Sequence, residues 1–253
     1  MIRSRLGPKS LGMFALVLGL MAVWVGVPRA ESTGGSWTYI RPGFEDLKTF
    51  EGPLPEPAFD AKLEAGTVGI LHVAEFLPGK LLLYECKALS VSEGKLKLGG
   101  EILGRITFKE CEAFIGGVLS TPCNPNAKGT QPGVIETLKL KAVMLLHKLA
   151  TGTVDKILVV ESDEPAPLNN NLAIVESIGP CEVGQKVPIR GKFAVQDSEP
   201  TTHKVYHLYK EFAPLTNILV VSNVGLLAAN ILGRAEAFLT AVHLSYKWAG
   251  LWN

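Results

Sequence analysis

The feature that most constrains the fold of this chain is a series of short apolar segments separated by turn residues. Val68–Val73 and Lys80–Leu89 are two such segments, and Pro78-Gly79 between them indicates a turn. In Glu101–Phe108, apolar and charged residues alternate, which is the pattern of a half-buried strand. Gly104 stands on the apolar side of this segment, which indicates a bulge or a close approach of another backbone.

Most of the remaining chain follows the same pattern. Val134–Leu146 favours a strand because lysines alternate with apolar residues in it, and a helix is the alternative. The 26 glycines, the 16 prolines and the lack of a strand–helix–strand rhythm predict an all-β fold, an antiparallel sandwich or barrel-like domain after an N-terminal hydrophobic signal helix. Further strands are expected at Ile157–Val160, Leu172–Val175, Val187–Val195, Val205–Tyr209 and Arg234–Thr240, and Asn217–Asn230 is apolar and partly β-branched.

A hydrophobic stretch precedes these segments. Arg3, Arg5 and Lys9 lead into an uncharged run from Leu11 to Val27, and Ala30 follows shortly after it. This order is typical of a secretory signal peptide cleaved near Ala30. The run is also long enough for a retained membrane anchor, which is the alternative. We therefore expect an extracytoplasmic protein that is secreted or held at the cell surface.

The sequence divides into three parts. Residues 1–30 form the signal peptide or anchor, residues 31–66 are irregular and rich in proline and glycine, and residues 67–253 form the β-rich domain. One short strand is expected within the irregular part, at Trp37–Ile40. A subdivision of the β-rich domain is possible near residues 197–202, a segment that suits a linker and a loop equally well.

The charge balance gives no basis for a polyanionic partner. The chain has a formal net charge of +1, and residues 1–30 contain four basic residues and no acid. Without them 21 basic and 24 acidic residues remain, a net charge of −3. Nucleic acid is therefore not expected as a partner, and a membrane is expected only through residues 1–30 if they are retained. The partner itself is unknown.

Four cysteines, Cys86, Cys111, Cys123 and Cys181, follow the leader. An even number in an exported chain predicts two disulfides. Of the three possible pairings we favour Cys111–Cys123, which closes a short loop rich in glycine, proline and asparagine, with Cys86–Cys181 joining distant strands. Zinc binding is disfavoured, because no two of these cysteines stand two to four residues apart.

A spaced pattern around these cysteines runs from Lys80 to Val195. It consists of Glu85-Cys86, Ile106-Thr107-Phe108 leading to Glu110-Cys111, Thr121-Pro122-Cys123, the segment Gly133–Leu140, and Pro180-Cys181. In this pattern the chain resembles a group of uncharacterised exported proteins of actinobacteria, and its C-terminal stretch Ile231–Trp252 looks similar as well. The resemblance implies an exported, β-rich domain held by disulfides. It implies no activity, cofactor or functional residue.

His203, His207 and Glu211 are spaced four residues apart, as metal ligands on one face of a helix are. On a strand, residues with this spacing stand about 13 Å apart, too far for one ion. The β-branched and aromatic residues around them favour a strand. These three residues are therefore weak candidates for a metal site, and no cofactor is expected.

Two other polar patterns are incomplete. His72 and Glu75 make half of a zinc-hydrolase motif without its second histidine, so a histidine at a strand end beside a surface acid is preferred. Glu161, Asp163 and Glu164 cluster in a loop that contains several asparagines, but they lack the register of a calcium-binding loop. A solvated polar loop is the better interpretation of this cluster.

Aromatic residues gather at the two ends of the mature chain, namely Trp37, Tyr246, Trp248 and Trp252. They indicate either a platform for stacking carbohydrates or, as we prefer, aromatic side chains packed on the core. No catalytic residue can be named. We expect a non-enzymatic binding or structural module that uses loops on a rigid sheet. An extracellular hydrolase whose site is assembled only by the fold and a membrane-tethered accessory protein are the alternatives.

Overall fold

The computed structural model describes residues 35–46, 48–49, 56–148, 154–168, 170–197, 207–211 and 216–252. The expected leader at residues 1–30 lies outside these residues, as does almost all of the segment 197–202. The described residues form strands and three short 3-10 turns, with no α-helix among them. The turns are η1 (Leu98–Gly100), η2 (Thr121–Cys123) and η4 (Ala241–His243).

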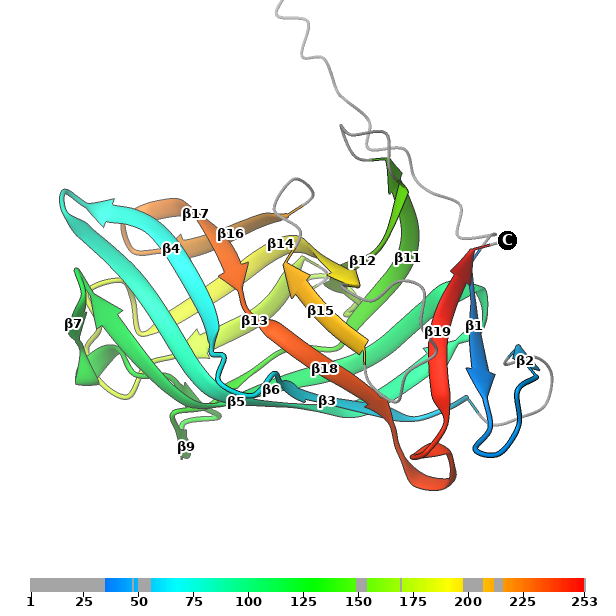
Figure 1. Ribbon diagram of the computed structural model, residues 1–253. Helices are drawn as coiled ribbons and strands as arrows, with labels where there is room; N and C mark the ends of the chain where they lie inside the picture. Colours follow the sequence, from blue (N-terminus) through cyan, green and yellow to red (C-terminus); the bar gives the residue numbers. More distant parts are fainter. Residues whose placement is uncertain are drawn as a thin grey trace, which may run out of the picture. The chain divides into compact units, whose positions relative to one another are not determined.

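The strands follow one another along the whole described chain (Figure 1). Those of the first half are β1 (Gly35–Ile40), β2 (Lys48–Thr49), β3 (Phe59–Leu63), β4 (Gly69–Leu77), β5 (Lys80–Lys97), β6 (Glu101–Ile115), β7 (Val118–Leu119), β8 (Asn126–Ala127), β9 (Gln131–Pro132) and β10 (Ile135–Glu136). Those of the second half are β11 (Leu140–Lys148), β12 (Val154–Ser162), β13 (Asn171–Glu176), β14 (Lys186–Asp197), β15 (His207–Glu211), β16 (Asn217–Ser222), β17 (Gly225–Leu232), β18 (Arg234–Leu239) and β19 (Lys247–Trp252).

The predicted all-β fold is confirmed, and its main sheet closes into an antiparallel barrel. Eight strands follow one another in the order β12-β11-β6-β5-β4-β17-β16-β14, and β14 pairs back with β12. In this closing pair Val159 lies opposite Ala194. Val134–Leu146, where strand and helix competed, contains β10 and most of β11. Side chains alternate between the two faces of each strand, and buried residues such as Val73, Leu82 and Val220 point into the barrel.

The long strands extend the barrel beyond this ring. The first part of β14 pairs with β16, whereas Val195–Asp197 pair with β15. The sheet continues from β15 through β18 to β3, and Ala58 just before β3 forms a bridge with Lys95 of β5. The interior therefore has two parts, one beneath β4, β17 and β16 and one beneath β3, β18 and β15.

The bulge expected near Gly104 is present. The register of β5 against β6 shifts between Ser92 and Lys95, directly across from Gly104. A Cβ atom on Gly104 would lie 3.0 Å from Cγ1 of Val91, which is too close for unhindered packing. Glycine is needed here because the two backbones approach each other closely.

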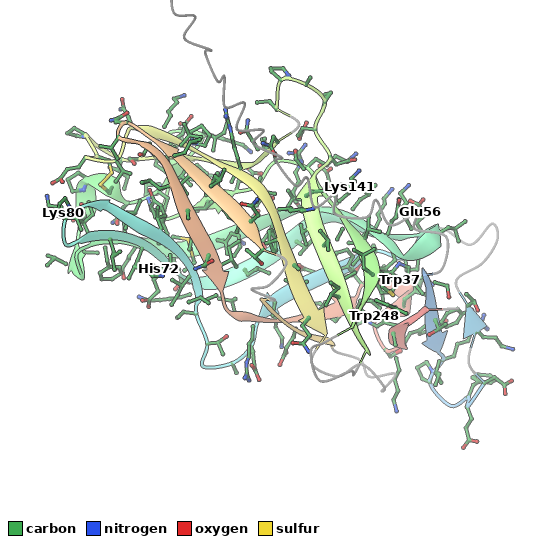
Figure 2. The ribbon with its side chains drawn as sticks, turned by 90° about the horizontal axis from the view of Figure 1, so that it is seen from above. Trp37, Glu56, His72, Lys80, Lys141 and Trp248 are labelled. Atoms are coloured by element: carbon green, nitrogen blue, oxygen red, sulfur yellow. A yellow bond between two sulfur atoms is a disulfide. The ribbon has the colours of Figure 1, made fainter. Side chains whose placement is uncertain are left out.

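A small second sheet joins the two ends of the described chain. Its order is β19-β1-β2, and Trp37 of β1 lies beside Trp248 of β19 with ring centroids 5.6 Å apart (Figure 2). Both tryptophans are buried, and the indole nitrogen of Trp37 donates a hydrogen bond to the carbonyl oxygen of Glu101. The interpretation as core residues is confirmed for Trp37 and Trp248, whereas Tyr246 is half-buried and the side chain of Trp252 is not described. Strand β1 matches the strand expected at Trp37–Ile40, whereas β3, which also lies within residues 31–66, was missed.

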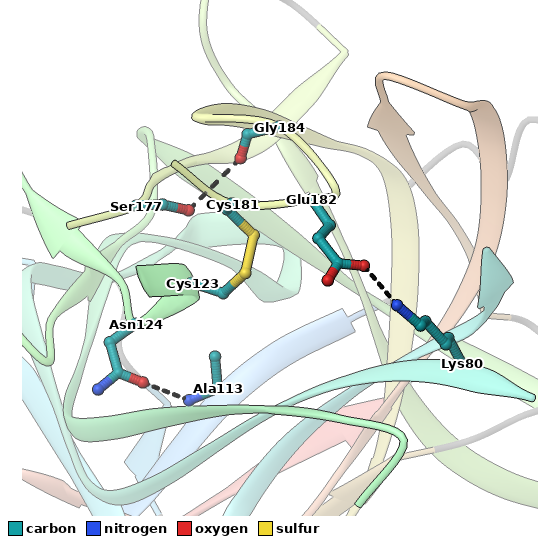
Figure 3. The surroundings of a disulfide bond; sticks show 8 residues. All are labelled: Lys80, Ala113, Cys123, Asn124, Ser177, Cys181, Glu182 and Gly184. Atoms are coloured by element: carbon teal, nitrogen blue, oxygen red, sulfur yellow. Dashed lines mark hydrogen bonds and ion pairs between the residues drawn. A yellow bond between two sulfur atoms is a disulfide. The ribbon is translucent and has the colours of Figure 1, made fainter. Parts of the chain in front are cut away.

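All four cysteines form disulfides, as expected, but the favoured pairing is wrong. The bridges are Cys86–Cys111 and Cys123–Cys181. Cys86 and Cys111 lie directly opposite each other on β5 and β6, a register that the sequence did not reveal. The second bridge ties two loops together (Figure 3), and beside it the side-chain oxygen of Asn124 accepts a hydrogen bond from the backbone of Ala113 at 2.8 Å.

Candidate functional site

The larger apolar cavity of the barrel has a volume of about 140 Å³. It lies beneath β3 and β18, and the buried ring of Trp248 forms part of its wall. Small residues occupy inward positions around it, so the side chains do not fill the space between the strands. These small lining residues are Ala61, Gly104, Ala142, Ala235 and Ala237.

The lining of this cavity is almost wholly apolar. Large side chains such as Phe59, Leu158 and Val160 complete its wall. Lys141 also borders the cavity, but its ammonium group pairs with the carboxylate of Glu161 at 3.2 Å. The cavity therefore offers van der Waals contacts to a ligand and no charged group for recognition.

A smaller cavity of about 60 Å³ lies beneath β4 and β17. Two of its lining residues carry hydroxyl groups, Tyr84 and Thr137. The Thr137 hydroxyl accepts a hydrogen bond from the backbone of Ile106 at 2.8 Å. Burial raises the pKa of the Tyr84 hydroxyl, and the neighbouring Ser177 lowers it to a smaller degree through a contact that falls short of hydrogen-bond geometry. Tyr84 therefore stays neutral and contributes an uncharged wall.

A polar cleft of about 400 Å³ lies on the outside of the barrel. Glu93, Glu136 and Glu176 line it, together with two cations. Each of these carboxylates pairs with a cation, at 3.8 Å for Arg105–Glu93, 2.8 Å for Lys128–Glu136 and 2.7 Å for Lys186–Glu176. The cleft is thus a surface of matched charges, which is the usual state of solvated strand faces.

Two of the three metal candidates lie on a strand and not on a helix. His203 lies outside the described residues. His207 and Glu211 are the first and last residues of β15, where four residues of strand span about 13 Å. Within the described part of the chain, no group of three or more histidine, cysteine, aspartate or glutamate side chains is placed to hold a metal ion.

The other polar candidates are dispersed as well. His72 lies on β4 opposite Leu83 of β5, and the side chain of Glu75 is not described. The carboxylates of Glu161, Asp163 and Glu164 pair with three separate cations, Lys141, Lys139 and Arg105, at 3.2, 2.9 and 3.3 Å. These acids therefore form three separate surface ion pairs and no common site.

The residues that line the cavity were not predicted from the sequence. Ala61, Ala142 and Ala237 give only a weak signal, because small residues at inward positions are visible only once strand faces are assigned. In Arg234–Thr240 the alternation was recognised, with Ala235 and Ala237 on one side. The cavity forms because β3, β11 and β18 place these small residues around the same space. This depends on how the strands are paired, and the sequence does not show that register.

The fold and its cavities define a disulfide-bonded antiparallel β-barrel with an apolar interior. Two disulfides are typical of proteins in an oxidising, extracytoplasmic environment. The described residues include no helix that is both long and apolar enough to span a membrane. No protein-family model, no curated protein and no solved structure matches the chain. The resemblance to exported actinobacterial proteins therefore stays a prediction.

Proposed function

We propose that this protein is an exported, non-enzymatic binding module that holds a small apolar molecule inside its barrel. The observation that carries the proposal is the cavity of about 140 Å³ around Ala61, Ala142 and Ala237. Protein interiors are close-packed, and voids larger than a water molecule are rare in them. An engineered cavity of about 150 Å³ lined by leucine, isoleucine and phenylalanine stays dry and binds benzene or xenon.

The chemistry of the lining supports an uncharged ligand. Leu158, Val160 and Trp248 contact the cavity, and its described lining includes no aspartate, glutamate or histidine. General acid–base catalysis needs such a group within hydrogen-bond reach of the reacting atoms. The lining therefore supports binding of an aromatic ring or a short hydrocarbon segment, and it favours binding over catalysis.

The disulfides and the N-terminal sequence support the compartment. Disulfides persist in oxidising surroundings, and both bridges are buried within the fold. The run from Leu11 to Val27 after three basic residues supplies an export signal. We therefore place the binding module beyond the cytoplasmic membrane, secreted or at the cell surface.

Benzene is the probe that tests this function. We expect the methyl NMR signals of Ala61, Ala142 and Ala237 to shift when benzene is added, because its ring current acts on atoms that it contacts. Ala237→Leu fills the cavity and removes the shifts. Ala65→Leu is the matched control, since Ala65 lies in an exposed turn, and it leaves them unchanged.

A second variant keeps the test decisive, and two outcomes would contradict the proposal. Ala61→Val, a smaller change in the same wall, weakens the shifts even if Ala237→Leu fails to fold. Benzene-induced shifts that are absent in the wild-type protein, or that persist in both cavity variants, contradict the proposed function.

A further inference from the structure

The two apolar cavities of the barrel follow one another along β6. Phe108 lines the smaller cavity, Gly104 lines the larger one, and Ile106 between them lines both. Successive residues on one face of a strand stand about 6.6 Å apart, so the stretch from Gly104 to Phe108 spans about 13 Å. The cavities are therefore arranged end to end beneath this strand.

Two other long strands repeat this order. On β14, Ile189 lines the smaller cavity, Val195 lines the larger one, and Phe193 between them lines both. On β5, Cys86 lines the smaller cavity and Leu89 the larger. Figure 1 shows β5 and β6 running side by side along the barrel. The three strands therefore define one axis along which both cavities lie.

Ile106 and Phe193 form the neck between the two cavities. Each of these side chains borders apolar space on two sides, because each lines both cavities. A side chain that is close-packed on every side cannot turn without displacing its neighbours, whereas a ring beside a void can turn into it. Rotation of the Phe193 ring opens a narrow passage, which favours a thin, flexible molecule over a broad, rigid one.

The lining on both sides of the neck suits a hydrocarbon. The described lining of the smaller cavity includes no charged residue, and its Thr137 hydroxyl already accepts a hydrogen bond from the backbone of Ile106. Around the larger cavity, the charge of Lys141 is paired with Glu161. A polar group of the ligand would lose its hydrogen bonds to water in either cavity. The enclosed part of the ligand is therefore apolar along its whole length.

We propose that the ligand is a straight alkyl chain that passes between Ile106 and Phe193 and occupies both cavities. This inference rests on the proposed function and names the class of molecule that the barrel holds. The larger cavity, of about 140 Å³, has the size that holds a six-carbon ring, and the smaller one, of about 60 Å³, adds room for about two carbons. A chain of about eight carbons extends over roughly 10 Å, which fits the span of about 13 Å along β6.

A series of straight alkanes from pentane to nonane, supplied as vapour, tests the proposal. The methyl NMR signal of Ala237 reports on the larger cavity and that of Ala173 on the smaller one. We expect binding to tighten about fourfold for each added methylene up to about eight carbons, because each buried methylene contributes about 0.8 kcal/mol. Octane is expected to shift both signals, whereas benzene shifts that of Ala237 alone.

Ala173→Leu fills the smaller cavity and separates the two parts of the interior. Ala173 is 3% exposed on β13 and lines the smaller cavity but not the larger one. We expect this variant to bind benzene as the wild-type protein does and to show no gain in affinity beyond hexane. Ala173→Val, a smaller change, gives the same test if Ala173→Leu fails to fold. Ala65→Leu is the control and leaves the whole series unchanged.

Octanoate at neutral pH identifies the source of the chain. Its alkyl chain is shared with octane, but its carboxylate has to remain in water. Binding of octane alone supports a free hydrocarbon as the ligand. Binding of octanoate as well, with the same shifts at Ala173 and Ala237, supports the chain of a fatty acid whose head group stays outside the cavities.

Two results overturn the alkyl chain and leave the proposed function intact. In the first, benzene binds but affinity does not rise beyond hexane and octane leaves the Ala173 signal in place. In the second, benzene binds and the alkane series is the same in the wild-type protein and in both Ala173 variants. Failure of benzene and of every alkane to bind overturns the proposed function together with this inference.

Discussion

Ile106 on β6 and Phe193 on β14 each line both apolar cavities of the barrel. The two side chains therefore stand between the larger space beneath β18 and the smaller space beneath β17. Phe193 is only 7% exposed, so its ring belongs to the interior. Access from one space to the other depends on this pair of side chains.

Phe193→Ala is expected to join the two cavities. Removing a buried phenyl ring costs about 3–5 kcal/mol of unfolding free energy, which chemical denaturation measures. If the variant stays folded, the joined space binds naphthalene, a larger probe than the wild-type cavity holds. Phe44→Ala is the control, since Phe44 is 63% exposed and its loss leaves stability nearly unchanged. An unfolding free energy of Phe193→Ala equal to that of the wild-type protein would contradict this account of the interior.

Removal of either disulfide is expected to destabilise the fold. The Cys86–Cys111 bridge spans 25 residues and the Cys123–Cys181 bridge spans 58. Chain entropy predicts losses of about 3.5 and about 4 kcal/mol, respectively. Paired Cys→Ala variants avoid free thiols, and their unfolding in denaturant measures both losses. The assigned pairing itself is checked by peptide mapping without reduction, and a Cys111–Cys123 peptide would refute it.

Gly191→Ala is expected to destabilise the protein by more than about 1 kcal/mol. Gly191 has a φ of +108°, and a Cβ atom there would collide with the carbonyl oxygen of Asn217 on β16. Gly69→Ala is the matched control, because a Cβ atom on Gly69 meets Phe108 at an ordinary 3.5 Å. Thermal unfolding compares the two variants. Equal stability of both would show that β14 and β16 approach each other less closely than described.

His243 is expected to titrate below its ordinary pKa of 6.5. Burial lowers its pKa most, and the charge of Arg41 lowers it further. The folded state therefore favours the neutral ring, so this stabilising contribution is complete above pH 6.5 and is lost as the pH falls from 6.5 through the folded-state pKa. Arg41→Met is expected to raise the pKa of His243 toward its ordinary value but not to reach it, because the effect of burial remains. NMR titration of the imidazole measures it, and a wild-type value at or above 6.5 would contradict this prediction.

The strands could be predicted from the sequence because alternation is a local property. Ile102 and Ile106 share a face whatever they pair with, and Pro78-Gly79 forms the turn of β4 and β5 as expected. Irregular composition hid β3, since Phe59–Leu63 follows a proline-rich stretch. Its bounds become evident only from its pairing with β18.

Features that depend on pairing could not be predicted. Cys86 lies opposite Cys111 only because of the register of β5 and β6, and a shift by one residue would turn one of the two outward. The cavity likewise needs Ala142 and Ala237 at the same depth in the barrel. The place of Trp37 and Trp248 also depends on distant partners, because the two residues stand near opposite ends of the described chain and form one buried pair.

A crystal structure of the protein under xenon pressure tests the central claim most directly. Xenon occupies dry apolar cavities of this size, and its anomalous scattering locates it without any assumption about the natural ligand. We expect one xenon atom in the larger cavity, in contact with Ala237, Leu158 and Trp248. An absence of xenon from the interior, or a chain of ordered waters in that space, would contradict the account of an apolar binding barrel.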